Sequence, residues 1–78
     1  MRVALKLARV GMNMEEATIV KWYKRTGDSF KTGEPLYEIE TEKVNQESAA
    51  TSDGTMVEIY AHEGEIVKVG GPVCAVDL

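Results

Sequence analysis

The sequence predicts an all-β domain, either a small β-sandwich or a flattened barrel, built from two similar halves. Residues 18–41 align with residues 55–78 without a gap. The identical pairs are Thr18/Thr55, Val20/Val57, Tyr23/Tyr60, Gly27/Gly64, Lys31/Lys68, Gly33/Gly70 and Pro35/Pro72. Both copies contain short apolar runs separated by glycines, which is typical of strands joined by turns. Because two copies are too few to stack as a solenoid, we expect the halves to pack face to face about a pseudo-two-fold axis.

Each half opens with a run typical of a β-strand. Residues 18–23 and 55–60 are rich in β-branched and aromatic side chains, with Lys21 and Glu58 at matching positions. Since side chains alternate between the two faces of a strand, the charged positions predict which side chains face the core. The inward-facing residues are then Val20, Trp22, Val57 and Ile59.

Glycine and proline mark the turns and the second strand of each half. Two glycines follow the first strand, at Gly27 and Gly33 in one copy and Gly64 and Gly70 in the other. A proline then opens the second strand, where a missing N–H is tolerated. Alternation along the second strands predicts that Tyr37, Ile39, Cys74 and Val76 face inward. We therefore expect the single cysteine to be a buried apolar side chain rather than a reactive thiol.

The segment 12–17 has the composition of a single helical turn, with nothing to support a helix on either side. We expect a loop here, in which Met12 and Met14 close one end of the core.

Size and charge exclude several classes of function. The chain has 78 residues and a net charge of −4, with 13 acidic and 9 basic side chains. A core this small leaves little room for an active-site cleft, which favours a carrier, binding or interaction module over an enzyme. Nucleic-acid binding needs clustered Lys and Arg, and a membrane helix needs about 20 apolar residues, so we expect neither partner. The lack of a targeting segment and the unpaired cysteine predict a cytoplasmic location.

The two halves differ where they join. The first copy continues into residues 42–47, whereas the second copy stops. Strand-like residues lie on both sides of Glu42 and Lys43, and residues 36–53 contain no glycine or proline. We expect a tight turn here, and a type I turn fits because it accepts most residues at its centre. Such a turn would place Lys43 at the tip of a hairpin, exposed to solvent. The carboxylates of Glu40, Glu42 and Glu47 are expected to flank it.

The chain resembles a lipoyl domain, the swinging-arm module of 2-oxo acid dehydrogenase complexes. Residues 10–17 are similar to the opening Leu-Gly-x-x-Met-x-Glu-Gly stretch of that family, and residues 19–22 and 27–28 match its Ile-x-x-Trp and Gly-Asp motifs. The family's modification site, Glu-Thr-Asp-Lys-Ala, resembles Glu40, Thr41, Glu42, Lys43 and Val44. The resemblance covers essentially the whole chain.

The resemblance implies that residues 1–78 form one lipoyl domain, with two four-stranded antiparallel sheets in a barrel-sandwich hybrid. It implies lipoic acid attached covalently to Lys43 as lipoyl-lysine by a lipoate ligase or lipoyl transferase. The arm would carry acyl groups and reducing equivalents within a 2-oxo acid or acetoin dehydrogenase complex. Its partners would be a thiamine-diphosphate-dependent component (E1), an acyltransferase core (E2) and dihydrolipoyl dehydrogenase (E3). The isolated domain, without an active site of its own, would be monomeric.

The chain departs from the family pattern at a few positions. Glu42 stands in place of the usual Asp and Val44 in place of Ala, and both keep the class of side chain. We therefore expect modification of Lys43 to persist. Ala17 and Arg9 also differ from the usual Gly and Leu, which bears on which partner enzyme accepts the domain.

Two other functions share this fold or composition. A biotin carboxyl carrier domain typically holds its lysine between two methionines, whereas Lys43 lies between Glu42 and Val44. An unmodified barrel-sandwich interaction module has no need for an acid-Lys-apolar turn at the junction. His62, the single histidine, is expected to be a solvated turn residue, because no Ser or Cys is placed to form a triad with it.

Overall fold

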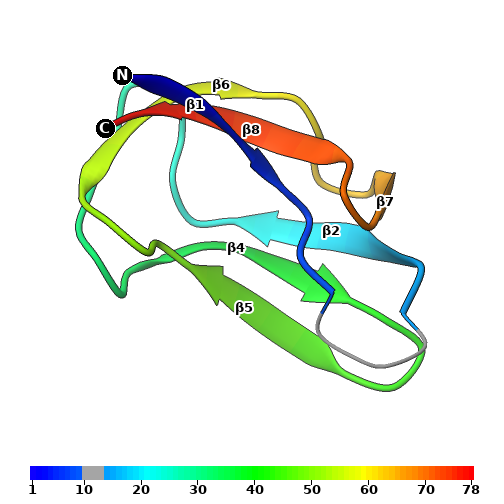
Figure 1. Cartoon of the computed structure of the whole chain (residues 1–78). Coiled ribbons are helices and arrows are strands. Elements are labelled where there is room, and N and C mark those ends of the chain that lie inside the picture. The colour runs from blue at the N-terminus through cyan, green and yellow to red at the C-terminus, as the bar shows by residue number, and fades with distance from the viewer. Residues whose placement is uncertain (10–13) are drawn as a thin grey trace.

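The computed structural model describes residues 1–9 and 14–78, and these residues form two four-stranded antiparallel sheets (Figure 1). One sheet has the strand order β1-β8-β6-β3 and the other β5-β4-β2-β7. The strands are β1 Arg2–Lys6, β2 Glu16–Trp22, β3 Ser29–Phe30, β4 Pro35–Glu40, β5 Asn45–Ala49, β6 Gly54–Ile59, β7 Ile66–Lys68 and β8 Pro72–Asp77. The predicted all-β fold of two such sheets is confirmed.

Hydrogen bonds between the halves follow the predicted pseudo-two-fold relation. In the first half the Gly27 N–H donates to the carbonyl of Met56 at 2.7 Å, and in the second the Gly64 N–H donates to the carbonyl of Ile19 at 2.7 Å. The short strands β3 and β7 are exchanged between the halves in the same way. β3 of the first half pairs with β6 of the second, and β7 of the second half pairs with β2 of the first. Each half therefore contributes a strand to the sheet of the other.

Two equivalent β-bulges shift the side chains that face the core. The register is interrupted between Ile19 and Lys21 in β2 and between Met56 and Glu58 in β6. Ile19 and Met56 are 0% and 1% exposed, whereas the expected inward residues Val20 and Val57 are only half-buried. The prediction was wrong at these two valines, because the extra residue of a bulge breaks strict alternation.

Other predictions about the core hold. Trp22 and Ile59, which follow the bulges, pack against the core, and Tyr37, Ile39, Cys74 and Val76 are buried. Burial raises the pKa of the Cys74 thiol to about 11, in keeping with a packing role. The glycines at the predicted turns have φ values of +86° to +95°, the left-handed region that glycine enters without strain.

The predicted loop at 12–17 is shorter than expected. β2 already begins at Glu16, and Ala17 is a buried strand residue. Met14 is buried as predicted, whereas Met12 lies outside the described residues. Within the described ranges no helix is long and apolar enough to cross a membrane.

Candidate functional site

The β4–β5 hairpin ends in a two-residue tip. The strands pair from Pro35 opposite Ala49 to Glu40 opposite Asn45. Beyond this last pair, the Thr41 N–H donates to the Val44 carbonyl at 2.8 Å. Glu42 and Lys43 form the tip, and both have negative φ, as do all described residues other than glycine. Negative φ excludes turn types I′, II and II′ and agrees with the predicted type I turn.

The hydroxyl of Thr41 ties the two sides of this tip together. Its Oγ1 donates to the Val44 carbonyl at 3.1 Å and accepts the Val44 N–H at 3.2 Å. It also lies 3.4 Å from the N–H of Lys43, which donates to it. Sequence reasoning placed Thr41 only among the neighbours of the lysine. The signal for its role was present, because Ser and Thr hydroxyls commonly bond to the backbone of a turn that follows them.

The side chain of Lys43 is exposed and takes part in no ion pair within the described residues. Ion pairs in that part of the chain include Met1–Asp77, Arg2–Glu58 and Lys24–Glu34. Glu42 and Val44 beside it are exposed as well. The position predicted for Lys43, at a hairpin tip and in solvent, is thus what the structure has.

Only part of the expected carboxylate setting surrounds Lys43. Glu40 ends β4 directly before the turn, and Glu42 is in the turn itself. Glu47 instead lies opposite Glu38 in the ladder, and its Oε2 accepts the Tyr23 hydroxyl at 2.8 Å. The expectation for Glu47 was wrong, because β5 carries its side chain away from the tip. Sequence spacing alone cannot reveal this, since it gives no strand register.

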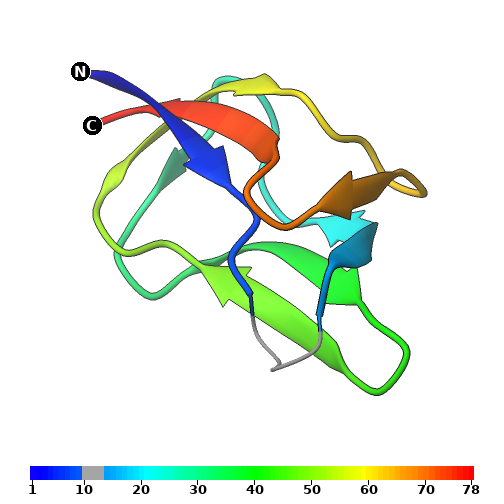
Figure 2. The same cartoon turned by 45° about the vertical axis from the view of Figure 1, so that its right-hand side comes forward.

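The tip lies at the opposite end of the domain from both termini (Figures 1 and 2). The N-terminal ammonium contacts Asp77 Oδ1 at 2.8 Å and the carbonyl of Leu78 at 2.9 Å, which holds the two chain ends together. The pseudo-two-fold relation explains the separation. The pseudo-two-fold axis relates the end of β4 to the end of β8. The turn after β4 and the C-terminus after β8 therefore lie at opposite ends of the domain.

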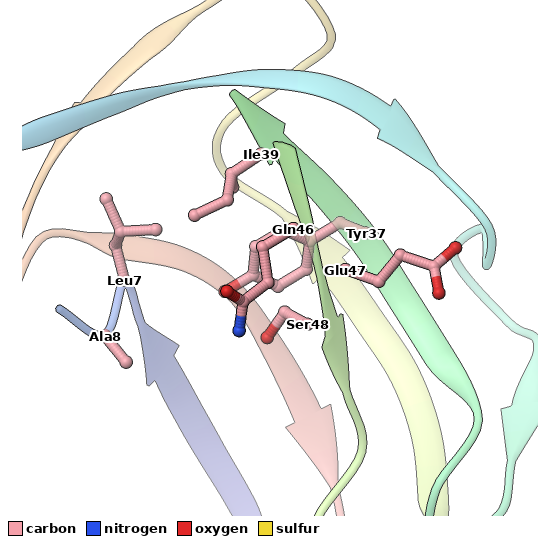
Figure 3. Close-up of a pocket in the computed structure, with 7 residues that line it drawn as sticks. All are labelled: Leu7, Ala8, Tyr37, Ile39, Gln46, Glu47 and Ser48. Carbon is pink, nitrogen blue, oxygen red and sulfur yellow. The ribbon is translucent and has the colours of Figure 1, made fainter. Parts of the chain in front are cut away.

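Hollows lie between β1 and the β4–β5 hairpin in the described part of the chain. A space of about 40 Å³ lies between the segment after β1 and the β4–β5 hairpin (Figure 3). It is lined by Leu7, Ala8, Tyr37, Ile39, Gln46, Glu47 and Ser48 and suits a water or two rather than a substrate. A hollow of about 210 Å³ farther along has no acidic, His or Cys side chain in its lining.

The described side chains provide no metal site, and the single histidine lies in a turn. No group of three or more His, Cys, Asp or Glu side chains there could hold a metal ion. His62 is exposed, and its N–H donates to Glu65 Oε1 at 2.8 Å. The Arg25 N–H donates to Asp28 Oδ2 in the same way in the first half. His62 is thus a turn residue, as predicted.

Comparison with known proteins agrees with this geometry. Residues 3–76 match the biotin/lipoyl family model described as "Biotin-requiring enzyme". The chain is 51% identical over 70 residues, 90% of its length, to the dihydrolipoyllysine-residue succinyltransferase component of the 2-oxoglutarate dehydrogenase complex of Rickettsia conorii. It is 40% identical over 72 residues, 92% of its length, to the dihydrolipoyllysine-residue acetyltransferase component of the pyruvate dehydrogenase complex of Acholeplasma laidlawii. The matches cover 18% and 13% of those relatives.

Solved structures give the same result for the fold. The lipoyl domain of the 2-oxoglutarate dehydrogenase complex of Azotobacter vinelandii superposes with a TM-score of 0.81 at 29% identity, covering 97% of this chain and 96% of that one. A single-chain, multi-domain long-chain acyl-CoA carboxylase matches with a TM-score of 0.81 over 97% of this chain and 7% of its own length. At 21% identity, that match shows the fold alone.

The two-sheet fold, with an exposed lysine at the tip of a hairpin, agrees with the class of protein that these comparisons indicate, a carrier domain. The chain belongs to the biotin/lipoyl attachment family. Within that family it is a lipoyl carrier domain of the type found in the acyltransferase components of 2-oxo acid dehydrogenase complexes.

Proposed function

We propose that Lys43 is the residue to which lipoic acid is attached and that residues 1–78 form one lipoyl domain. The observation that carries the proposal is the presentation of Lys43. Its side chain is exposed and outside every ion pair of the described residues, while its backbone lies in a turn bonded through Thr41. A fixed backbone with a free amine suits both a modifying enzyme and a long flexible arm.

The residues of the tip fit this group. An amide formed by Nζ of Lys43 with the lipoate carboxyl removes one positive charge, so the net charge changes from −4 to −5. Bound lipoate supplies a dithiolane that accepts acyl groups and electrons. The domain itself contributes the position of the attachment point and has no active site of its own. Tethering keeps the carried group at an effective concentration of order mM near its partners.

The partners follow from the family and remain part of the proposal. The arm would serve a thiamine-diphosphate-dependent dehydrogenase component, an acyltransferase core and dihydrolipoyl dehydrogenase, after modification by a lipoate ligase or lipoyl transferase. The chain spans less than a fifth of the curated relatives described above, so a longer acyltransferase component is the expected setting. A cytoplasmic location and a monomeric isolated domain stay predictions from the sequence.

Biotin is the second candidate, because carrier domains for the two cofactors share this fold. The side chains beside Lys43 favour lipoate. Glu42 and Val44 occupy the two adjacent positions, and among residues 36–53 there is no methionine.

Intact mass spectrometry tests the proposal. We expect the chain co-expressed with a lipoate ligase in lipoate-supplemented cells to gain one lipoyl group, and Lys43→Arg to gain none. Lys68→Arg, which changes an exposed lysine elsewhere, is the matched control and should be modified like the parent chain. A biotin-sized addition, an unmodified parent chain, or modification that persists in Lys43→Arg would overturn the assignment.

A further inference from the structure

We propose that Thr41 is the positioning residue of the modification turn and that its hydroxyl sets the rate at which Lys43 is modified. This inference rests on the proposed attachment of lipoate to Lys43. Thr41 does not reach the reacting amine, and it acts through the backbone of the turn.

The hydroxyl uses its full hydrogen-bonding capacity at the tip. A threonine hydroxyl has one donor and two acceptor positions. The donor is directed to the Val44 carbonyl at 3.1 Å, and the acceptors take the N–H groups of Val44 at 3.2 Å and Lys43 at 3.4 Å. In an ordinary β-turn, the carbonyl of the first residue accepts the N–H of the fourth. Here a side chain accepts the N–H of the fourth residue.

Few other contacts hold the tip. The last ladder pair, Glu40 with Asn45, lies before the turn, and the Thr41 N–H adds one bond to the Val44 carbonyl. Thr41 is half-buried, whereas residues 42–44 are exposed. The turn contains no proline or glycine that would restrict or specially shape its backbone. Loss of the hydroxyl would therefore leave a single backbone bond between Thr41 and Val44.

The expected consequence falls on modification rather than on folding. The tip lies outside the apolar core, whose nearest member along β4 is Ile39. A modifying enzyme must bring the amine of Lys43 to its activated acyl group, and small errors in placement reduce such rates steeply. A loosened tip presents Lys43 in many orientations, of which a few are productive.

Two substitutions separate the hydroxyl from the shape of the side chain. Thr41→Val keeps the branched shape and removes the hydroxyl, and Thr41→Ser keeps the hydroxyl. The matched control is Thr32→Val, because the Thr32 hydroxyl also makes a loop contact, donating at 3.0 Å to Oδ1 of Asp53 in another loop. Thr32→Val therefore removes a comparable hydroxyl bond at a different turn.

The readouts are kcat/KM for modification by a lipoate ligase and amide exchange by NMR. We expect Thr41→Val to lower kcat/KM by about tenfold or more, and Thr41→Ser and Thr32→Val to stay within about threefold of the parent chain. The N–H groups of Lys43 and Val44 should exchange faster in Thr41→Val alone, at an unchanged thermal midpoint.

The possible failures are distinguishable. Parent-like modification of Thr41→Val, with the parent chain itself modified at Lys43, overturns the positioning role and leaves the proposed function intact. A parent chain that is not modified at Lys43 overturns both. Slow modification of Thr41→Val and Thr41→Ser alike would assign the effect to side-chain shape rather than to the hydroxyl, which also overturns the inference.

Discussion

The Tyr23 hydroxyl lies 2.8 Å from Oε2 of Glu47, and this contact joins the end of β2 to the edge strand β5. The same hydroxyl is 3.0 Å from Oε1 of Glu38, the residue opposite Glu47 on the intervening strand β4. The three side chains thus connect neighbouring strands on the sheet that carries the Lys43 hairpin. Hydrogen bonding to Glu47, with desolvation and the bond to Glu38, raises the pKa of the Tyr23 phenol above its usual value.

We expect Tyr23→Phe to loosen β5. The change removes the hydroxyl that stands between two carboxylates and keeps the ring, which leaves like charges facing each other across the ladder. Amide exchange should accelerate in β5 and much less in β8. Tyr60→Phe is the matched control, because Tyr60 is the equivalent residue of the second half and its hydroxyl is 3.5 Å from the Arg2 guanidinium. Equal exchange in the two variants would contradict the role of Tyr23.

The raised pKa of Tyr23 predicts a loss of stability at alkaline pH. The folded domain holds the phenol proton more tightly than the unfolded chain, whose tyrosines ionise near pH 10. The contribution to stability is therefore fully present below about pH 10 and is lost as the pH rises through the folded-state pKa. Denaturation curves from pH 8 to pH 11 should show a steeper decline for the parent chain than for Tyr23→Phe. Parallel curves would contradict this assignment.

Gly54→Ala should destabilise the domain. An added Cβ would lie 2.7 Å from the Asp77 carbonyl oxygen, closer than real Cβ contacts, and 3.0 Å from Cζ of Phe30, which is tighter than most of them. We expect a loss of about 1–3 kcal/mol in the free energy of unfolding, typical of overpacking. Urea denaturation measures it, and Ser29→Ala, an exposed change on the adjacent strand, is the control. A stability equal to that of the parent would contradict the close packing at Gly54.

The difference between the halves at this position has a structural explanation. Gly54 pairs with Phe30 on the neighbouring strand, and its counterpart Ala17 pairs with Val67. A methyl group at residue 54 would meet the Asp77 carbonyl oxygen at 2.7 Å, Leu78 Cδ2 at 2.8 Å and the Phe30 ring at 3.0 Å, whereas the methyl group of Ala17 is accommodated in the core. The alanine found where the resembled family usually has glycine is therefore compatible with the fold.

Trp22→Ala should cost about 3 kcal/mol or more in the free energy of unfolding. The ring packs against the core, 4.9 Å from the Tyr37 ring, and its Nε1 donates to the Ala61 carbonyl at 2.8 Å. Circular dichroism in urea measures the loss without relying on the fluorescence of the removed residue. Trp22→Phe should cost less, because it keeps much of the apolar contact and loses the hydrogen bond. An unchanged unfolding midpoint in Trp22→Ala would contradict a core role.

The internal repeat made the fold predictable, because two copies with glycines at the same spacing are expected to form equivalent turns and strands. The hairpin tip followed from the polar residues between the copies. The bulges at Val20 and Val57 could not be predicted, since alternation carries no signal for an inserted residue. The same limit explains Glu47, which is close to Lys43 in the sequence but bonds to Tyr23 in the fold. These details depend on strand register, and tertiary packing decides register.

Lys43→Ala should abolish modification and leave the fold unchanged. The side chain lies outside the core and takes part in none of the ion pairs of the described residues, so its removal costs no packing. The free energy of unfolding should stay within about 0.5 kcal/mol of the parent value, as is usual for surface substitutions. The comparison should use unmodified parent protein, because attachment of lipoate also removes the lysine charge. A loss of cooperative unfolding in Lys43→Ala would mean that the lysine stabilises the hairpin, which would contradict a role limited to carrying the cofactor.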